Sequence, residues 1–177
     1  MLQPPSPQSF AFADLVGFTA LTEAYGDEAA ADLALAFADE VSLLAAEHGA
    51  EIVKTLGDAV MIRCPDHCQA IRLALRILEE LSDRRGFPAI RIGMHTGPAV
   101  QRAGDWFGAT VNLAARVAAT AQAGELLITE ATRAAIAAAQ PAVTLHDRGS
   151  QSFKNVLSPL LVYAAASTGR EPVPVAA

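Results

Sequence analysis

Two apolar runs separated only by Gly57 and Asp58 constrain the fold of this chain more than any other sequence feature. A Gly-Asp pair between two such runs is typical of the turn of a β-hairpin, so Asp58 is predicted at the hairpin tip. Upstream, residues 9–18 predict a short buried strand that ends in a tight turn at Asp14. Between this strand and the hairpin, residues 27–47 carry apolar positions at helical spacing and predict an amphipathic helix.

A second helix and a third strand complete this unit. Asp66 and Gln69 predict a capping box at the start of a helix that Gly86 and Pro88 end. Residues 90–95 then alternate apolar and polar positions, as a half-buried strand does. The order βαββαβ predicts an α+β fold of the ferredoxin-like type, an antiparallel sheet with helices on one face, extended by further C-terminal strands and helices. These later elements are expected as a Gly-rich turn and helix over 104–117, strands over 126–129, 143–147 and 160–164, and a helix over 130–139.

The length of 177 residues suits one domain that buries a core without disulfides or structural metals. Residues 1–7 and 166–177 contain several prolines and little to bury, so they are predicted to be flexible tails. The folded catalytic or binding domain is therefore expected over residues 8–165.

The formal net charge of −6 argues against a nucleic-acid-binding protein, because such a protein needs a basic face. A phosphate-containing ligand would have to be held locally by a few cationic side chains. Cys64 and Cys68 lack the further Cys or His partners of a zinc site and are interpreted as reduced thiols. No apolar run approaches the ~20 residues of a membrane span, and the first residues do not resemble a signal peptide, so we expect a cytoplasmic protein without membrane contact.

Asp14 and Asp58 are the first candidates for chemistry. Because the first strand and the hairpin can be neighbours in a βαββ unit, the two carboxylates can converge at one edge of the sheet. Such a pair suits hard divalent cations, which can activate an attacking oxygen and stabilise a leaving pyrophosphate. Each aspartate taken alone also fits an ordinary turn residue, so the surrounding motifs have to decide between the two interpretations.

Five motifs occur in the order and at roughly the spacing of class III nucleotide cyclases, and the chain resembles this family over about residues 9–164. The motifs are DLVGFT (14–19), VKTLGDAVM (53–61), RIGMHTGPAV (91–100), GDWFGATVNLAARV (104–117) and GELLIT (124–129). On these motifs the chain is similar to stand-alone bacterial adenylate cyclase catalytic domains of the mycobacterial type. The resemblance implies the class III cyclase fold and the conversion of ATP to 3′,5′-cyclic AMP and pyrophosphate.

The resemblance assigns the metal ions and the purine to specific residues. Asp14, Asp58 and the Leu15 carbonyl would bind two divalent ions, Mg²⁺ or Mn²⁺. Lys54 and Asp105 occupy the positions that read the purine in this family. Adenine offers an acceptor at N1 and a donor at its amino group, which a lysine and an aspartate match, whereas guanine reverses both polarities. ATP is therefore the predicted substrate, and a guanylate or dual-specificity cyclase is the alternative.

The resemblance also assigns residues to the ribose and the phosphates. Asn112 would orient the ribose, and Arg116, four residues further along one helical face, would stabilise charge on the α-phosphate during in-line attack by the ribose 3′-oxygen. Lys154 falls where the family places a lysine on the terminal phosphates, although Asn155 stands where many relatives have glycine. No general base can be identified among these residues.

A homodimer is the assembly that the resemblance implies. The metal-binding aspartates would come from one domain and the purine-reading and transition-state residues from the other, and a two-fold dimer would then build two equivalent sites. The alternatives are a nucleotide-binding regulatory module without catalysis and a ferredoxin-like interaction domain without a nucleotide. His95 is interpreted as a structural histidine, Trp106 as a packing or pocket-wall residue, and Arg91 receives no role.

Overall fold

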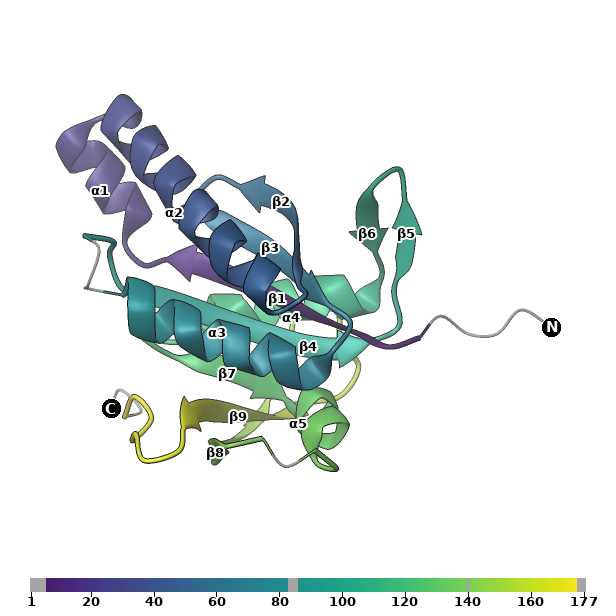
Figure 1. Ribbon diagram of the computed structural model, residues 1–177. Coiled ribbons are helices and arrows are strands. Elements are labelled where there is room, and N and C mark those ends of the chain that lie inside the picture. Colours follow the sequence, from purple (N-terminus) through teal and green to yellow (C-terminus); the bar gives the residue numbers. More distant parts are fainter. Residues whose placement is uncertain (1–5, 83–85, 140, 175–177) are drawn as a thin grey trace.

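The computed structural model describes residues 6–82, 86–139 and 141–174, and its main feature is a seven-stranded sheet (Figure 1). The strand order is β2-β3-β1-β4-β7-β9-β8, and β5 and β6 form a separate two-stranded hairpin. The strands are β1 (Gln8–Leu15), β2 (Glu51–Leu56), β3 (Ala59–Cys64), β4 (Ile90–Gly97), β5 (Val100–Arg102), β6 (Asp105–Phe107), β7 (Leu126–Thr129), β8 (Val143–Gln151) and β9 (Leu160–Ser167). The helices are α1 (Phe18–Tyr25), α2 (Asp27–Glu47), α3 (His67–Leu81), α4 (Ala109–Thr120) and α5 (Glu130–Ile136).

Four adjacent strands, β2-β3-β1-β4, form the predicted ferredoxin-like unit, so the α+β fold class is confirmed. β1 lies at the centre of this unit and is antiparallel to both β3 and β4. β7 extends the sheet parallel to β4, and β9 and β8 follow in antiparallel order. The whole sheet is therefore mixed, because the crossover through α4 returns the chain to the sheet in the direction of β4.

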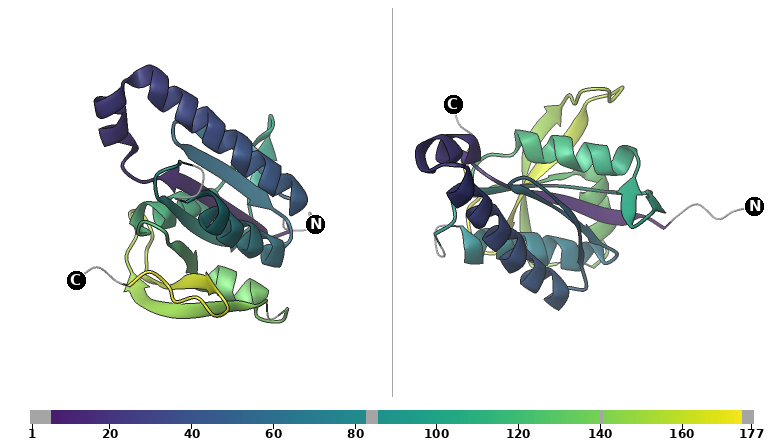
Figure 2. Two further views of the ribbon diagram at one scale, coloured as in Figure 1. Left: turned by 60° about the vertical axis from the view of Figure 1, so that its left-hand side comes forward. Right: turned by 90° about the horizontal axis from the view of Figure 1, so that it is seen from above.

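The two helices of the predicted ferredoxin-like unit, α2 and α3, lie on one face of the sheet as expected, and the later helix α4 covers the other face. Alternate residues of a strand point to opposite faces. Ala13 and Leu15 of β1 belong to the core beneath α2 and α3, whereas Phe10 and Phe12 pack with α4. Seen from above, α4 lies on one side of the sheet and α2 and α3 lie on the other (Figure 2). β1 is apolar on both faces because it is a central strand with two helical layers.

The sequence pattern predicts neither α1 nor the β5–β6 hairpin. α1 is eight residues long and has no buried residue, so no apolar face packed on the core marks it in the sequence. It begins after Gly17, whose φ of +78° lies in the left-handed region that favours glycine. β5 and β6 are three residues long and are joined through Ala103 and Gly104, which both have positive φ. None of the helices in the described part of the chain is both long and apolar enough to cross a bilayer.

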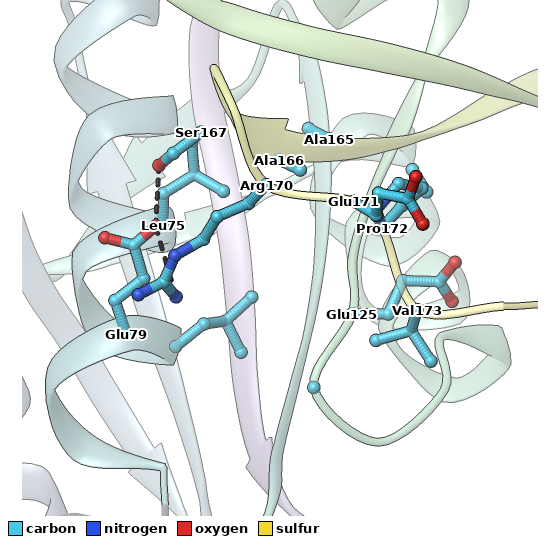
Figure 3. A pocket seen from close by; sticks show the side chains of 13 residues that line it. Leu75, Glu79, Glu125, Ala165, Ala166, Ser167, Arg170, Glu171, Pro172 and Val173 are labelled. Atoms are coloured by element: carbon cyan, nitrogen blue, oxygen red, sulfur yellow. Dashed lines mark hydrogen bonds and ion pairs between the residues drawn. The ribbon is translucent and has the colours of Figure 1, made fainter.

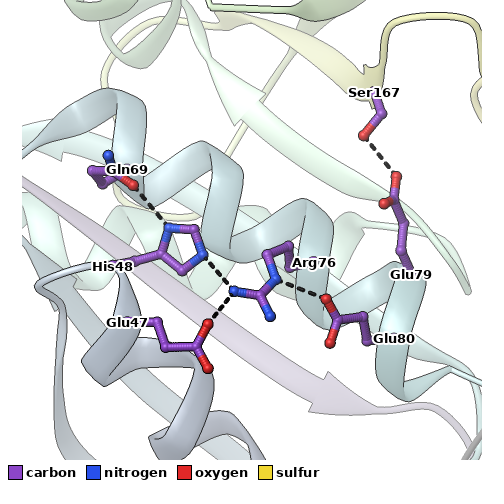
Figure 4. Close-up of polar contacts among 7 residues, drawn as sticks. All are labelled: Glu47, His48, Gln69, Arg76, Glu79, Glu80 and Ser167. Atoms are coloured by element: carbon purple, nitrogen blue, oxygen red, sulfur yellow. Dashed lines mark hydrogen bonds and ion pairs between the residues drawn. The ribbon is translucent and has the colours of Figure 1, made fainter.

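The start of α3 contains half of the predicted capping box. Asp66 Oδ1 accepts hydrogen bonds from the backbone nitrogens of Cys68 at 2.9 Å and Gln69 at 3.0 Å. Such an N-cap contributes about 1 kcal/mol to stability. The Gln69 side chain does not reach back to Asp66, because its Oε1 lies 2.8 Å from Nδ1 of His48 at the end of α2 (Figure 4).

Arg76 of α3 contacts three side chains, and two of them, Glu47 and His48, lie at the end of α2 (Figure 4). Its guanidinium donates to Glu47 Oε2 and to Glu80 Oε1, each at 2.7 Å, and lies 3.2 Å from His48 Nε2. Because arginine can only donate, His48 Nε2 accepts here and its Nδ1 donates to Gln69. Partly exposed ion pairs of this kind contribute little stability, so their effect is to set the position of α2 against α3.

Residues 168–174, which we expected within a flexible tail, make specific contacts. β9 extends to Ser167, whose Oγ donates to Glu79 Oε1 of α3 at 2.6 Å. Arg170 follows and lies 3.7 Å from the same carboxylate oxygen. These residues border a pocket between α3 and β9, into which the Arg170 side chain extends toward Glu79 (Figure 3).

A buried ion pair holds the last described residues on the sheet. Arg148 Nε of β8 donates to Glu125 Oε1 at 2.9 Å, and the side chains of both residues are almost inaccessible to solvent. The Arg148 guanidinium also donates to the backbone carbonyl of Val173. Of the predicted tails, residues 1–5 and 175–177 lie outside the described part of the chain.

Gly93 sets how closely α4 approaches the sheet. A Cβ atom at this position would lie 1.9 Å from the backbone nitrogen and 2.3 Å from the Cα of Ala118. A helix backbone cannot rotate away as a side chain can, so α4 would have to move off β4. We predict that Gly93→Ala lowers the free energy of unfolding by about 1–3 kcal/mol or more, measured by urea denaturation.

Gly97→Ala is the matched control for this prediction. A Cβ atom at Gly97 would meet only the side chain of Thr110, at 2.7 Å from its Oγ1. This contact is longer and is made with a side chain rather than with the helix backbone, so the loss of stability should be smaller. Equal losses in the two variants would contradict the assignment of the α4 backbone as the obstacle.

Candidate active site

The two candidate metal-binding aspartates meet where β1 ends and the β2–β3 hairpin turns. Asp14 pairs with Ala59 across β1 and β3, which places it beside Asp58 in the turn. Gly57 makes this turn with a φ of +64°. Burial, followed by the hydrogen bond between the two carboxyl groups, raises the pKa of Asp58 to about 6. Two carboxyl groups that share a proton in this way can bind a cation in place of that proton.

Arg91 is the residue that sequence reasoning missed at this position. It lies opposite Asp14 in the β1–β4 pairing, and its Nε and Nη2 lie 2.8 and 2.5 Å from Asp14 Oδ2. Its Nη1 also donates to the carbonyl of Ala119 at the end of α4. Alternation within β4 already places Arg91 on the polar side of the strand. The register of β4 against β1 is what identifies Asp14 as its partner.

The donor set at this position fits a magnesium or manganese ion. Within the described residues, no group of three or more His, Cys, Asp and Glu side chains is placed to hold a metal. Mg²⁺ is commonly bound by one or two carboxylates, with water and substrate phosphates completing its coordination. Asp14 and Asp58 supply such a pair, and Leu15, the last residue of β1, follows Asp14 directly with its backbone carbonyl.

The two candidate purine-reading residues are in direct contact. Lys54 Nζ donates to Asp105 Oδ2 at 2.6 Å, and the backbone nitrogen of Trp106 donates to Asp105 Oδ1 at 2.8 Å. Lys54 lies at an irregularity in the β2–β3 pairing, and Asp105 begins β6. The hydrogen bond from Lys54 holds the pKa of Asp105 below its usual value. The structure therefore brings together a donor and an acceptor that are 51 residues apart in the chain.

The candidate ribose and phosphate residues lie on α4 and on the loop between β8 and β9. Asn112 and Arg116 border one pocket together with residues 155–158 of this loop. The Arg116 side chain forms no hydrogen bond or ion pair with another described residue. Lys154 is exposed in the same loop but does not line this pocket. Asn155 has a φ of +60°, a conformation that asparagine tolerates better than most residues, so it can replace a glycine there.

The candidate residues form three groups on one chain. The aspartates lie where β1 ends and the β2–β3 hairpin turns, the Lys54–Asp105 pair joins β2 to β6, and the third group lies on α4 and the loop between β8 and β9. Over the ranges that the structure covers, no hydrogen bond or ion pair joins Asp14 or Asp58 to either of the other groups. One chain therefore presents the three groups without joining them through direct contacts.

Comparison with known proteins identifies the family of this chain. The family model described as "Adenylate and Guanylate cyclase catalytic domain" matches residues 3–163. The chain belongs to this family. The cyclase domain is 42% identical over 126 residues to a pH-sensitive adenylate cyclase of Mycobacterium tuberculosis. The aligned region covers 71% of this chain and 32% of the relative. It is 41% identical over 117 residues to an adenylate cyclase of Streptomyces griseus. This second alignment covers 66% of this chain and 29% of the relative. The chain thus spans less than a third of the length of these two relatives.

Solved cyclase structures have the same fold as this cyclase domain. The adenylyl cyclase CyaB from P. aeruginosa superposes with a TM-score of 0.80 at 25% identity, over 95% of this chain and 97% of the other. The guanylate cyclase domain of RhGC from Catenaria anguillulae, in complex with GTP, superposes with a TM-score of 0.79 at 23% identity, over 94% of this chain and 100% of the other. The class III cyclase fold predicted from the motifs is therefore confirmed.

His95 of the cyclase domain contacts a network of buried hydroxyl groups. Its Nδ1 lies 2.7 Å from Thr129 Oγ1, which is 3.5 Å from Thr132 Oγ1. Thr96 Oγ1 donates to Thr132 at 3.1 Å and lies 2.8 Å from Ser9 Oγ. Burial lowers the pKa of His95 to about 4, so this histidine is neutral near pH 7.

The half-buried His95 predicts a loss of stability in acid. The folded protein binds a proton at His95 only near pH 4, whereas the unfolded chain binds it near pH 6.5, so stability falls as the pH decreases between these values. His95→Asn keeps a polar atom near the position of Nδ1 but does not titrate. We predict a shallower decrease of the free energy of unfolding in this variant, measured by urea denaturation at a series of pH values. Parallel curves for the two proteins would contradict this assignment.

Proposed function

We propose that this domain converts ATP to 3′,5′-cyclic AMP and pyrophosphate. The contact of 2.6 Å between Lys54 Nζ and Asp105 Oδ2 carries the proposal, because it places one donor beside one acceptor. Adenine presents an acceptor at N1 next to a donor at its amino group, and this pair can satisfy both; guanine presents the opposite polarities. Membership of the cyclase family and the two adenylate cyclase relatives support the same substrate.

The proposed metal ligands are Asp14, Asp58 and the Leu15 carbonyl. Two divalent ions bound there would lower the pKa of the ribose 3′-hydroxyl and stabilise the charge of the leaving pyrophosphate. In the protein itself, Arg91 partly neutralises Asp14, while burial keeps a proton on Asp58 up to about pH 6. Both carboxylates are needed in the ionised form for a hard cation, so Arg91 has to share Asp14 with the metal.

The proposed transition-state residues are Asn112 and Arg116, with Lys154 on the terminal phosphates. Arg116 makes no contact with a charged partner among the residues described, so its guanidinium is available for an external anion. Its planar fork can donate to two phosphate oxygens at once. The ribose 3′-oxygen would attack the α-phosphate in line with the leaving pyrophosphate, and orientation by Asn112 would favour this geometry.

The proposed active form is a homodimer with two shared sites. The aspartates of one copy would face the purine-reading and transition-state residues of the other, which agrees with the absence of direct contacts between these groups in the described part of one chain. A two-fold dimer repeats such a site twice. A second copy thus completes the site that one chain leaves divided.

We propose that the domain binds ATP and a second copy of the chain. We do not expect it to bind nucleic acid or a membrane. The net charge of −6 does not favour a nucleic-acid surface. Cys64 and Cys68 are free thiols, which suits the reducing cytoplasm, where ATP is also available. We therefore propose a cytoplasmic location.

The first test measures cyclic nucleotides formed from ATP or GTP with Mg²⁺ or Mn²⁺. We predict cyclic AMP from ATP, little cyclic GMP from GTP, and loss of product in Asp58→Ala, because one of the two carboxylates is removed. Asp66→Ala is a suitable control, because it removes a helix N-cap but no residue of the site. A folded, dimeric protein that forms no cyclic nucleotide under any of these conditions would favour a regulatory nucleotide-binding module.

A second test concerns the shared sites. Arg116→Ala should lower the rate on the order of 100 to 1,000-fold, because it removes a donor to the transition state. Mixing Arg116→Ala with Asp58→Ala should restore about a quarter of the normal activity, since half of the dimers are mixed and each has one intact site. The activity is measured after subunit exchange has been verified with differently tagged copies. Inactive mixtures with complete exchange would contradict a shared site.

A further inference from the structure

The β5–β6 hairpin carries Asp105 at a position that its own strands do not secure. Asp105 pairs with Arg102 next to the turn at residues 103–104, so it lies at the free end of the hairpin. Two strands of three residues each are not stable as an isolated unit. The hairpin belongs to a sheet separate from the main sheet. Contacts with the rest of the domain must therefore fix Asp105.

Trp106 supplies these contacts next to Asp105. Its ring lies edge-to-face with Phe10, with centroids 5.6 Å apart, and the Arg63 guanidinium lies 5.0 Å from its ring centroid. Its Nε1 donates to Glu51 Oε1 at 3.1 Å. One side chain thus makes an aromatic contact, a cation–π contact and a hydrogen bond with the main sheet.

The three partners of Trp106 form one row across the main sheet. Glu51 of β2 pairs with Arg63 of β3, and Arg63 pairs with Phe10 of β1. Phe10 is fully buried, and Arg63 Nε is buried without a hydrogen-bond partner within the described residues. Trp106 lies against this row, and the Arg63 guanidinium is close to both the Trp106 ring and the Glu51 carboxylate, with Nη1 3.9 Å from Glu51 Oε1.

We infer that Trp106 is a positioning residue for purine selection, which it controls by anchoring Asp105 through Glu51, Arg63 and Phe10. In the free domain Lys54 also holds Asp105, at 2.6 Å. An adenine bound to both residues would replace this contact, and Trp106 would then be the remaining anchor beside Asp105. The inference rests on the proposed adenine reading by Lys54 and Asp105.

The test compares kcat/KM for ATP and for GTP in variants of the full chain. Trp106→Ala should lower the preference for ATP on the order of tenfold or more, because a displaced acceptor no longer discriminates between the purines. Glu51→Ala and Arg63→Met should lower it by smaller factors. Glu51→Gln keeps an acceptor for Trp106 Nε1 and should retain the preference, so it serves as the conservative rescue.

Phe87→Leu is the control for a general loss of stability. Phe87 is buried and packs edge-to-face with Phe37 in the core beneath α2, remote from the hairpin. This variant should lower the melting temperature but leave the ATP-to-GTP ratio unchanged. An unchanged ratio in Trp106→Ala, together with a lower melting temperature, would show a structural role alone and would overturn the inference.

Fluorescence provides a readout that is independent of activity. The chain contains a single tryptophan, so its emission reports on Trp106 alone. Glu51→Ala and Arg63→Met should shift the emission to longer wavelengths as the ring becomes more exposed, and Glu51→Gln should not. An emission shift without a change in the ATP-to-GTP ratio would overturn the inference. If the unaltered protein forms no cyclic nucleotide, the proposed function is refuted instead. In that case an unshifted emission in Glu51→Ala and Arg63→Met would still refute the role of Glu51 and Arg63 in holding Trp106.

Discussion

The antiparallel pairing of β1 with β3 on one side and β4 on the other positions the candidate chemistry. Asp14 lies opposite Ala59 of β3 and Arg91 of β4, so a single register brings both Asp58 and Arg91 to one carboxylate. A slip of one residue would turn every side chain of β1 to the other face. Such a slip would exchange the large Phe10 and Phe12 on one face for the small Ala11 and Ala13 on the other, so close packing on both faces opposes it. Hydrophobic packing far from the site therefore fixes the relative positions of its charges.

The negative charges of Asp14 and Asp58 repel each other where β1 meets the β2–β3 turn. Asp58 retains a proton up to about pH 6 because it is partly buried and lies against Asp14, and the positive charge of Arg91, which contacts Asp14 directly, opposes this rise in the pKa only partly. Functional sites commonly keep such arrangements, which a chain selected only for stability would avoid. The Lys54–Asp105 pair differs, because each member satisfies the other until a ligand separates them. These differences agree with the proposal that the aspartates bind cations and that Lys54 and Asp105 bind the purine.

Much of this arrangement could be predicted, and the misses share a physical cause. The helix over residues 27–47 and the turn with Asp58 follow from apolar periodicity and from a Gly-Asp pair. α1, β5 and β6 are short and have little or no buried face, so few positions in their sequences mark them. α2 and α3 lie on one face as the ferredoxin-like order predicts, and β1 is apolar on both faces, so it also accepts a second layer, that of α4.

The sequence by itself determined the order of the strands and helices other than α1, β5 and β6, the five cyclase motifs, and the chemical polarity of Lys54 and Asp105, because these depend on local spacing and residue type. Only the tertiary structure decided which distant side chains meet. Arg91 contacts Asp14, and Trp106 contacts Arg63 and lies beside the tip of its hairpin. Such contacts depend on strand register and on the docking of a short hairpin, and both are settled by packing across the whole sheet rather than by neighbours in the chain.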